Sequence, residues 1–184
     1  MEHWSDALRG LGACDDGIEW AATQPDAETA WRTCTRGDWM LWLLGRRHCE
    51  RETLEHRALV AIACECARLA LPHVLPGEMR PLRAIEAAER YARGEAISHE
   101  ELRAAARAAA AAAAWAGVAA AAAAAYAYSA AADAARASVA DAAAADADAA
   151  AWAAANAAAA DAARASTRAQ CADIVRRHWP TSPI

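Results

Sequence analysis

Residues 104–116 read AAARAAAAAAAWA, and this composition continues to residue 165, with alanine at 44 of the 62 positions from Ala104 to Ala165. Alanine has the highest intrinsic helix propensity because its side chain loses no rotamer freedom in a helix. No proline interrupts the chain between Pro81 and Pro180. A buried alanine removes little apolar area from water, so helices of this composition can pack only at short distances. The sequence therefore predicts an all-α fold, built as a single-domain helical bundle.

The first half of the chain, residues 1–97, has a different composition. It contains five of the eight tryptophans and most of the leucine, and glycine and proline recur through it. We therefore expect short helices here, which pack against the long alanine-rich helices of residues 98–179, with residues 180–184 as a tail. The expected helices cover Asp6–Trp20, Asp26–Cys34, Asp38–Leu44 (with Asp38 as its cap), Glu50–Leu71 and Pro81–Arg93.

The alanine-rich half is expected to fold back on itself. Ser98-His99-Glu100-Glu101 matches a capping box, and the helical signal then continues to Trp179. As one rod these 82 residues would be about 120 Å long, whereas a compact chain of this size is about 40 Å across. The segment AADAARAS at 131–138 recurs at 159–166, which favours two folds and a break near residues 157–161. Codon slippage in a GC-rich gene, within one bent helix, is the alternative explanation of the repeat.

Charge argues against two classes of partner. The chain contains no lysine, and its formal net charge is -5. Proteins that bind nucleic acids normally have a basic face, so no nucleic-acid polymer is expected as a partner. Charged residues within the alanine tract would each cost about 2.5–3.5 kcal/mol at the centre of a bilayer, which argues against a membrane span. The first residues lack the basic and then apolar pattern of a secretory signal, so we expect a cytoplasmic protein.

No catalytic or metal-binding pattern is recognisable in the sequence. In a cytoplasmic chain the six cysteines are expected to be reduced and buried as small apolar side chains. Cys64 and Cys66 would point about 200° apart on a helix, so they cannot bind one metal ion. No nucleophile lies beside a histidine in a recognisable pattern, and no glycine-rich phosphate loop occurs. We therefore expect no catalytic residues, no metal and no cofactor, and a protein that is not an enzyme.

The most concentrated functional signal lies at residues 31–42, which read WRTCTRGDWMLW. Tryptophan and arginine dominate binding hot spots, but the same tryptophans can fill the core that alanine leaves thin. We expect Trp39 and Trp42 mainly in the core, and Trp31 and Arg36 fit either role. Two further charged residues, Glu65 and Arg68, lie in an apolar helical stretch and need polar partners, for which Arg36 or Asp38 are candidates. The candidate residues for binding a partner or ligand are Trp31, Arg36, Asp38, Trp39, Trp42, Glu65 and Arg68.

Several of these motifs support a family resemblance. Cys14…Gly17-Ile18-Glu19-Trp20 is followed by Trp31…Cys34-Thr35-Arg36-Gly37-Asp38-Trp39-Met40-Leu41-Trp42-Leu43-Leu44. This series, continued by Ala63–Arg68, Pro81–Glu86 and Gln170–Arg176, resembles the alanine-rich, all-helical immunity proteins of bacterial polymorphic-toxin systems. Relatives of that group also occur in phage genomes. The resemblance implies a cytoplasmic protein that neutralises a toxin, with no enzymatic activity or cofactor.

Three functional hypotheses remain open. The leading one is a non-enzymatic interaction protein that binds and neutralises a protein toxin or effector. The alternative is a small-molecule-binding protein, such as a phage-encoded anti-defence sponge for a nucleotide signal. In that case Arg36 and Arg68 would bind phosphate and the tryptophans would stack on a base, so a deep cavity lined by these residues would favour it. The third is a structural module that forms homo-oligomers through an exposed alanine face.

Overall fold

The structure is a computed structural model that describes residues 3–47, 53–74, 76–119 and 161–184. This part of the chain contains eight α-helices, one 3-10 turn and no strand, which confirms the predicted all-α class. None of the helices in these residues is both long and apolar enough to cross a membrane.

Four short helices form the N-terminal part: α1 (Asp6–Leu11), α2 (Asp15–Ala22), α3 (Ala27–Thr33) and α4 (Gly37–Arg47). The prediction of a single helix over Asp6–Trp20 is wrong. Gly12 adopts a left-handed conformation, with φ of 82°, and its N–H donates to Arg9 O, so α1 ends there. Cys14 is extended and begins α2. Glycine has no Cβ penalty in the left-handed region, which explains why the break occurs at this residue.

Side-chain caps fix the start of several helices. Asp26 Oδ1 accepts a hydrogen bond from Thr29 N at 2.6 Å, which begins α3 as predicted and lowers the pKa of Asp26. Ser98 Oγ accepts from Glu101 N at 3.1 Å, which confirms the first half of the predicted capping box. The second half is wrong, because the Glu101 carboxylate accepts from Arg90 at 2.7 Å instead of reaching back.

The remaining helices are α5 (Leu54–Arg68), the 3-10 turn η1 (Leu71–His73), α6 (Arg80–Ala92), α7 (His99–Ala119) and α10 (Asp161–His178). The helix predicted over Glu50–Leu71 therefore begins later, at Leu54 after the cap Thr53, and ends three residues early. Pro72 lies in the 3-10 turn that follows. The helix predicted over Pro81–Arg93 matches α6 within one residue at each end.

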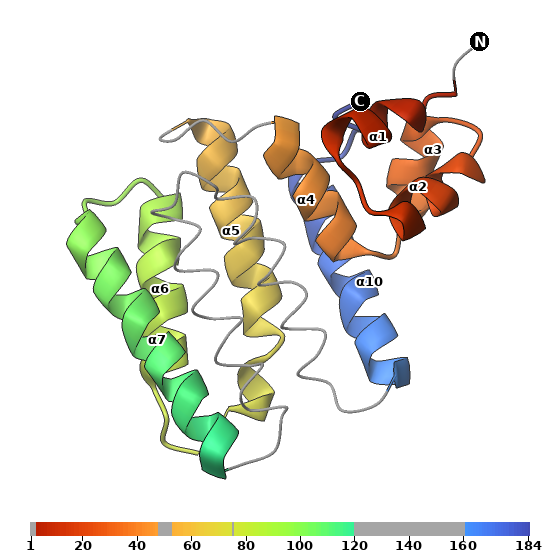
Figure 1. The fold of residues 1–184 in the computed structure, drawn as a ribbon. Coiled ribbons are helices and arrows are strands. Elements are labelled where there is room, and N and C mark those ends of the chain that lie inside the picture. The colour runs from red at the N-terminus through yellow and green to blue at the C-terminus, as the bar shows by residue number, and fades with distance from the viewer. Residues whose placement is uncertain (1–2, 48–52, 75, 120–160) are drawn as a thin grey trace.

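The helices are arranged around α5 (Figure 1). On one side α6 packs against both α5 and α7, and on the other side α10 packs against both α4 and α5. The helices α1–α3 gather beside α4, close to the C-terminal end of the described chain. The two described ends of the alanine tract, α7 and α10, thus occupy different positions in the bundle, so the tract is not one straight rod. The first copy of the repeat and the predicted break near 157–161 lie outside the described residues.

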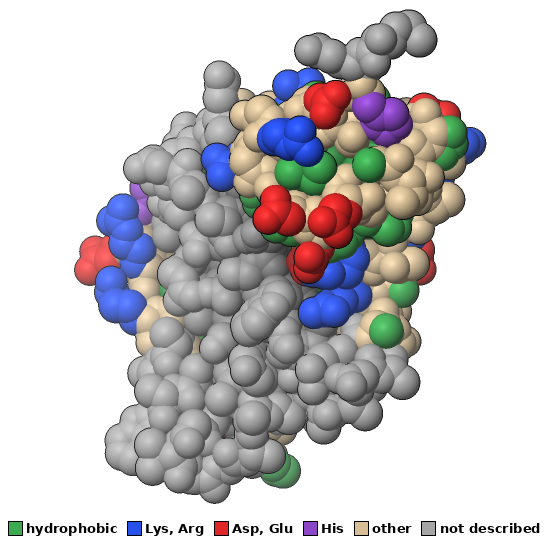
Figure 2. All heavy atoms as spheres, turned by 45° about the vertical axis from the view of Figure 1, so that its right-hand side comes forward, with side chains coloured by type: hydrophobic (Ala, Val, Ile, Leu, Met, Phe, Trp, Pro, Cys, Tyr) green, Lys and Arg blue, Asp and Glu red, His purple; other side chains and the backbone are tan. Residues whose placement is uncertain are grey.

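One cluster of buried side chains joins the two halves of the sequence. It runs from Leu8 in α1 to Val175 in α10, and leucine and isoleucine side chains of α4 and α5 supply its bulk. Among the described side chains of α7, Ala106 and Ala109 are buried in this cluster and Ala105 packs against it, so each adds one methyl group. The surface of the N-terminal helices is polar: α2 begins with the exposed carboxylates of Asp15 and Asp16, and Figure 2 shows acidic side chains gathered on this face.

The start of α4 approaches the backbone of α10 very closely at Gly37. A Cβ atom built on Gly37 would lie 2.7 Å from both Ala172 N and the carbonyl carbon of Cys171. No side-chain carbon fits at such distances from another backbone, so the contact between α4 and α10 requires glycine at this position. Gly10 in α1 has open space around the same position, with nothing within 4 Å.

These two glycines give a matched test of the packing. Gly37→Ala should destabilise the fold by about 1–3 kcal/mol or more, because α4 must move away from α10. Gly10→Ala should be neutral or stabilise by up to about 1 kcal/mol, because it restricts the unfolded chain without a clash. Urea unfolding followed by circular dichroism measures both. Equal effects of the two substitutions would rule out the close packing at Gly37.

Most of the cysteines are buried thiols. Cys34, Cys64, Cys66 and Cys171 are free and buried, whereas Cys14 is free and exposed, and Cys49 lies outside the described residues. Cys64 Sγ lies 3.9 Å from Ile85 O on α6, and the Cys66 thiol is hydrogen-bonded to Cys171 on α10, so the two side chains diverge as predicted. Within the described ranges no three His, Cys, Asp or Glu side chains form a group that could hold a metal ion.

Burial changes the acidity of these thiols. It raises the pKa of Cys34 and of Cys64. The hydrogen bond to Cys171, together with burial, raises the pKa of Cys66 well above its ordinary value. An unfolded cysteine ionises near pH 8.5. The folded chain therefore holds three thiols protonated in a pH range where the unfolded chain loses those protons.

We expect alkaline conditions to destabilise the protein for this reason. A raised folded-state pKa contributes stability that is complete below pH ~8.5 and is lost as the pH rises further. The unfolding free energy should fall by up to about 1.4 kcal/mol per pH unit for each thiol that ionises only in the unfolded chain. Urea titrations between about pH 7.5 and 9.5 measure this, and the absence of lysine removes one competing titration. Cys64→Ala should have a shallower dependence, and an equally steep one would contradict the assignment.

Candidate functional site

The residues predicted as the main functional cluster form a corner between α3 and α4. After α3 ends at Thr33 the chain becomes extended at Cys34, and α4 begins at Gly37. Arg36 bridges this corner: its Nε donates to Asp38 Oδ1 at 2.9 Å and its Nη2 to Asp38 Oδ2 at 2.6 Å. This two-point ion pair raises the pKa of Arg36. Asp38 was predicted to cap α4, but it lies within the first turn and its carboxylate binds Arg36.

Helix α10 is hydrogen-bonded to the main chain of this corner. Arg176 Nη1 donates to Cys34 O at 2.7 Å and to Trp31 O at 3.2 Å, which satisfies carbonyl groups at the C-terminal end of α3. The indole N–H of Trp31 in turn donates to Trp179 O at 2.9 Å. Three hydrogen bonds therefore join the corner to Arg176 of α10 and to Trp179, the residue that follows this helix.

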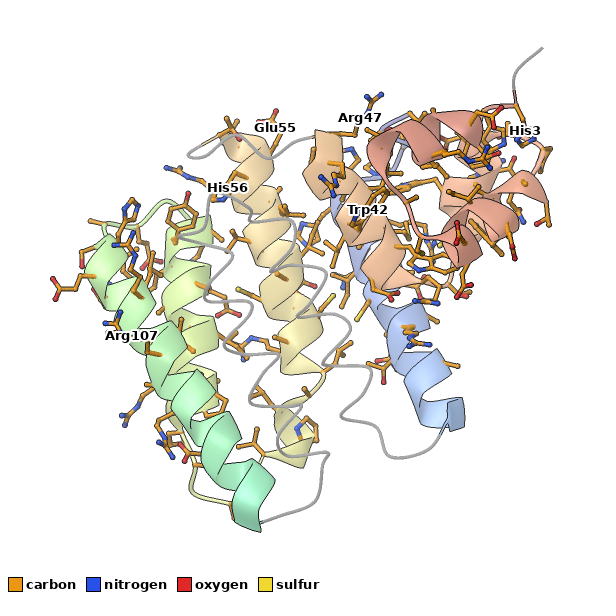
Figure 3. All side chains as sticks on the ribbon, in the orientation of Figure 1. His3, Trp42, Arg47, Glu55, His56 and Arg107 are labelled. Atoms are coloured by element: carbon orange, nitrogen blue, oxygen red, sulfur yellow. The ribbon has the colours of Figure 1, made fainter. Side chains whose placement is uncertain are left out.

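The corner forms part of a cavity of about 520 Å³ that we call the tryptophan cavity. Its wall is made by residues of α1–α4, by the turns that join them and by the segment that follows α10. Five tryptophans line it, which are all those of residues 1–97: Trp4, Trp20, Trp31, Trp39 and Trp42. Figure 3 shows Trp42 on the side of α4 that faces α1–α3. The other described wall residues are mostly small or aliphatic.

The aromatic rings of the cavity are held in defined positions. The ring centroids of Trp20 and Trp39 are 6.1 Å apart at an interplanar angle of 53°. Trp39 also contacts Arg36, whose guanidinium lies 4.1 Å from the centroid of the Trp39 ring. Trp4 Nε1 donates to Gln24 O at 3.2 Å, as Trp31 donates to Trp179. Since these two indole N–H groups have acceptors within the protein, their burial in the wall leaves no unpaired donor.

The charge of the cavity wall is low. Among the described residues of the wall, Asp38 has the only acidic side chain, and no arginine lines the cavity. The Asp38 side chain is 9% exposed and its charge is paired with Arg36, whose side chain is 29% exposed. A wall of indole rings with one neutralised carboxylate suits an apolar, uncharged group, because an ion placed there would lose its hydration without gaining a free opposite charge.

Two of the predicted site residues lie elsewhere. Arg68 Nε pairs with Glu89 on α6 at 2.6 Å. Glu65 accepts from Arg177 at 2.9 Å and lies 2.6 Å from His178 Nε2, both at the end of α10. The expectation that Glu65 and Arg68 find partners in Arg36 or Asp38 is therefore wrong, because neighbouring helices in the bundle supply those partners. They do not contribute to the tryptophan cavity.

The cavity also contains residues that sequence reasoning did not place there. Trp4 belongs to the tryptophan-rich half and Trp20 also to the Gly17–Trp20 motif of the family resemblance, but their spacing in the sequence does not predict that both line one cavity. Cys14 was treated as a core thiol, but it lies exposed in the wall. Ser182 and Ile184 line the cavity although they lie far from the corner in sequence, and no sequence signal indicated this.

Comparison of the chain with family models, with curated proteins and with solved structures finds no match. The resemblance to immunity proteins therefore stays a prediction. What the fold and the site define is an all-α protein with a tryptophan-lined cavity between its N-terminal helices and the end of α10.

The cavity predicts a difference in reactivity between its two thiols. Cys14 is exposed, whereas Cys34 is buried and has a raised pKa. N-ethylmaleimide at neutral pH should therefore alkylate Cys14 at least about tenfold faster than Cys34, as mapped by peptide mass spectrometry. Labelling in urea gives the control in which the two rates converge. Equal rates in the folded protein would contradict the described wall.

Proposed function

We propose that this chain is a non-enzymatic binding protein that captures an apolar, uncharged group in the tryptophan cavity. The single observation that carries the proposal is the cavity itself, an open hollow of about 520 Å³ whose wall includes five tryptophans. Ligand sites in proteins are typically cavities of about 300–1,000 Å³ with mainly apolar and aromatic walls and few polar groups. The tryptophan cavity has this size and composition.

The wall is suited to binding because its parts are already ordered. Arg36 and Asp38 fix the first turn of α4, and Trp31 is 3% exposed and bonded to the end of α10. A preformed wall reduces the entropy that is lost when a ligand binds. Each favourable aromatic contact adds about 0.5–1.5 kcal/mol to the gain from burial, so a flat or branched apolar group would be retained by several walls at once.

The proposal is compatible with the neutralisation of a protein toxin or effector. A partner that inserts one apolar side chain into a tryptophan-lined cavity would bind through the kind of desolvated anchor that dominates protein interfaces. The resemblance to immunity proteins supports this role. Neutralisation of such a partner should require one copy of this chain for each copy of the toxin, whereas inactivation by a substoichiometric amount would indicate catalysis.

The nucleotide alternative receives less support from the same site. It required Arg36 and Arg68 to bind phosphate beside stacked tryptophans. Arg68 is paired with Glu89 away from the cavity, and Arg36 is paired with Asp38 at its edge. A phosphate group would have to displace Asp38 from Arg36, next to the carboxylate that it repels. The geometry therefore favours an uncharged ligand.

Binding of a neutral apolar dye tests the proposal. N-phenyl-1-naphthylamine should bind at one saturable site, with energy transfer from tryptophan to the dye. At ten times the Kd it should stabilise the folded chain by about 1.4 kcal/mol, whereas ATP or a cyclic dinucleotide should leave the melting temperature unchanged.

A matched pair of variants locates the dye. Ala27 lines the cavity and is partly exposed, so Ala27→Leu should fill part of the volume and weaken dye binding by about tenfold, which is about 1.4 kcal/mol. Ala22 is exposed on α2 and does not line the cavity, so Ala22→Leu should bind like the parent chain. The proposal fails if the dye does not bind, or if both substitutions act alike.

A further inference from the structure

Three carboxylates lie along α2 beside the tryptophan cavity. Asp15, Asp16 and Glu19 are exposed. The residues of this segment that line the cavity lie next to them in the sequence: Cys14, Gly17, Trp20 and Ala21. Because Cys14 is exposed and Trp20 is partly exposed, this part of the wall reaches the molecular surface. The three carboxylates therefore lie where the cavity wall meets solvent, on the face on which Figure 2 shows acidic side chains.

These carboxylates are not neutralised within the described chain. Helix α2 contains no basic residue, and none of the three carboxylates forms an ion pair with a described residue. The helix dipole stabilises Asp15 and Asp16, which lie in the first turn of α2. Glu19 lies one turn further on, four residues from Asp15, where two like charges repel each other. The folded chain therefore keeps a negative charge here that a partner of opposite charge would neutralise.

The N-terminal helices carry most of the net charge of the chain. Residues 3–33 contain six acidic side chains and two arginines, so their net charge is -4, compared with -5 for the whole chain. Arg9 is paired with Asp6 at 3.7 Å, and Arg36 is paired with Asp38. These pairs leave the carboxylates of α2 as an unpaired negative surface beside the cavity.

The last turn of α4 supplies two arginines near the same cavity. The Arg46 guanidinium lies 5.6 Å from the centroid of the Trp42 ring. Arg47 Nε donates to Pro183 O at 3.2 Å. Both arginines already contact groups of the protein, so they are less available to a partner than the carboxylates of α2.

We propose that the tryptophan cavity receives one apolar side chain of a partner protein whose surface around that side chain is rich in arginine or lysine, and that the carboxylates of α2 bind those cations. The inference rests on the proposed function, since it names the kind of partner for the same cavity. The apolar wall supplies affinity for the inserted side chain, whereas the carboxylates select the charge of the surface that carries it. Opposite charges also increase the rate of encounter.

The arrangement of the carboxylates fits a protein surface better than a small cation. Asp15 and Glu19 are about 6 Å apart along the axis of α2, at ~1.5 Å per residue, and Asp16 is rotated by about 100° from Asp15. One ammonium group therefore pairs closely with only part of this set, because an ion pair requires an N···O distance of at most ~4 Å. Several arginine or lysine side chains around one apolar anchor can pair with all three carboxylates.

Displacement of N-phenyl-1-naphthylamine from the full chain tests the inference. The probe is the peptide acetyl-Gly-Arg-Arg-Phe-Arg-Arg-Gly-amide, and the matched peptide has glutamine at each arginine position. In 0.1 M NaCl the arginine peptide should displace half of the dye at a concentration at least about tenfold lower than the glutamine peptide. In 1 M NaCl this preference should be lost, because the Debye length falls from about 10 Å to about 3 Å. A peptide with serine in place of phenylalanine should not displace the dye.

Two double variants with the same change in net charge locate the carboxylates that bind the cations. Asp16→Asn/Glu19→Gln removes two of the three charges of α2 and should reduce the preference for the arginine peptide to at most about threefold. Glu86→Gln/Glu100→Gln neutralises two exposed carboxylates of α6 and α7 that do not line the cavity, so it should keep the preference of the parent chain. Circular dichroism and dye affinity should match the parent in both variants, because all four side chains are exposed.

The outcomes separate this inference from the proposed function. If the dye binds but the arginine peptide displaces it no better than the glutamine peptide, or not at all, the inference is overturned and the proposed function stands. An equal loss of preference in the two double variants overturns it in the same way. If the dye does not bind the parent chain, both are overturned.

Two further measurements distinguish other occupants of the cavity. Phenylethylammonium has the same ring as the peptide and a single charge. If it displaces the dye at the same concentration as the arginine peptide, the ligand is a small cation and the inference is overturned. Light scattering that shows a dimer of the free chain, dissociated by the dye, would assign the cavity to a second copy of this chain and would also overturn it.

Discussion

The contact between the start of α4 and the backbone of α10 is the constraint on which the rest of the structure depends. Gly37 brings the two backbones together at Cys171 and Ala172, and Arg176, a little over one turn further along α10, binds the carbonyl groups that end α3. These two features fix the direction in which the chain leaves α3 and enters α4. The position of Trp31, Asp38 and Trp39 follows from that direction, and with it one side of the tryptophan cavity.

Two kinds of apolar residue form the interior of the bundle. Alanine in α7 and in the described part of α10 allows close packing but supplies little apolar area, whereas leucine and isoleucine of α4 and α5 fill the centre. The tryptophans were expected to add bulk to this core. Only Trp31 of the five in the N-terminal half is buried; Trp4, Trp20, Trp39 and Trp42 are partly buried, pack against the core cluster and line the cavity. The rings of Trp20 and Trp39 meet at an interplanar angle of 53° in the cavity wall, so these tryptophans shape the site as well as adding to the core.

Local signals made much of this fold predictable. The helix class follows from alanine, and the starts of α3 and α7 follow from Asp26 and Ser98, because a cap acts within three residues of itself. The partners of Glu65 and Arg68 could not be predicted, since they lie on α6 and α10 and the choice depends on how the bundle assembles. The site was predictable only in part. Arg36, Asp38, Trp39 and Trp42 are close in sequence, but Trp4, Trp20 and Ile184 reach the cavity through tertiary packing.

The composition of the cavity wall has a consequence for biosynthesis. Trp4 and Ile184 both line the cavity, although they lie near opposite ends of the described chain. During translation of residues 4–184 the ribosome adds Trp4 first and Ile184 last. Helices α1–α3 therefore emerge long before α10, the helix that binds the corner between α3 and α4. The nascent chain therefore exposes its tryptophans without a complete pocket. The wall is complete only after residue 184 has been added, so any molecule that meets the chain during translation meets an unfinished surface.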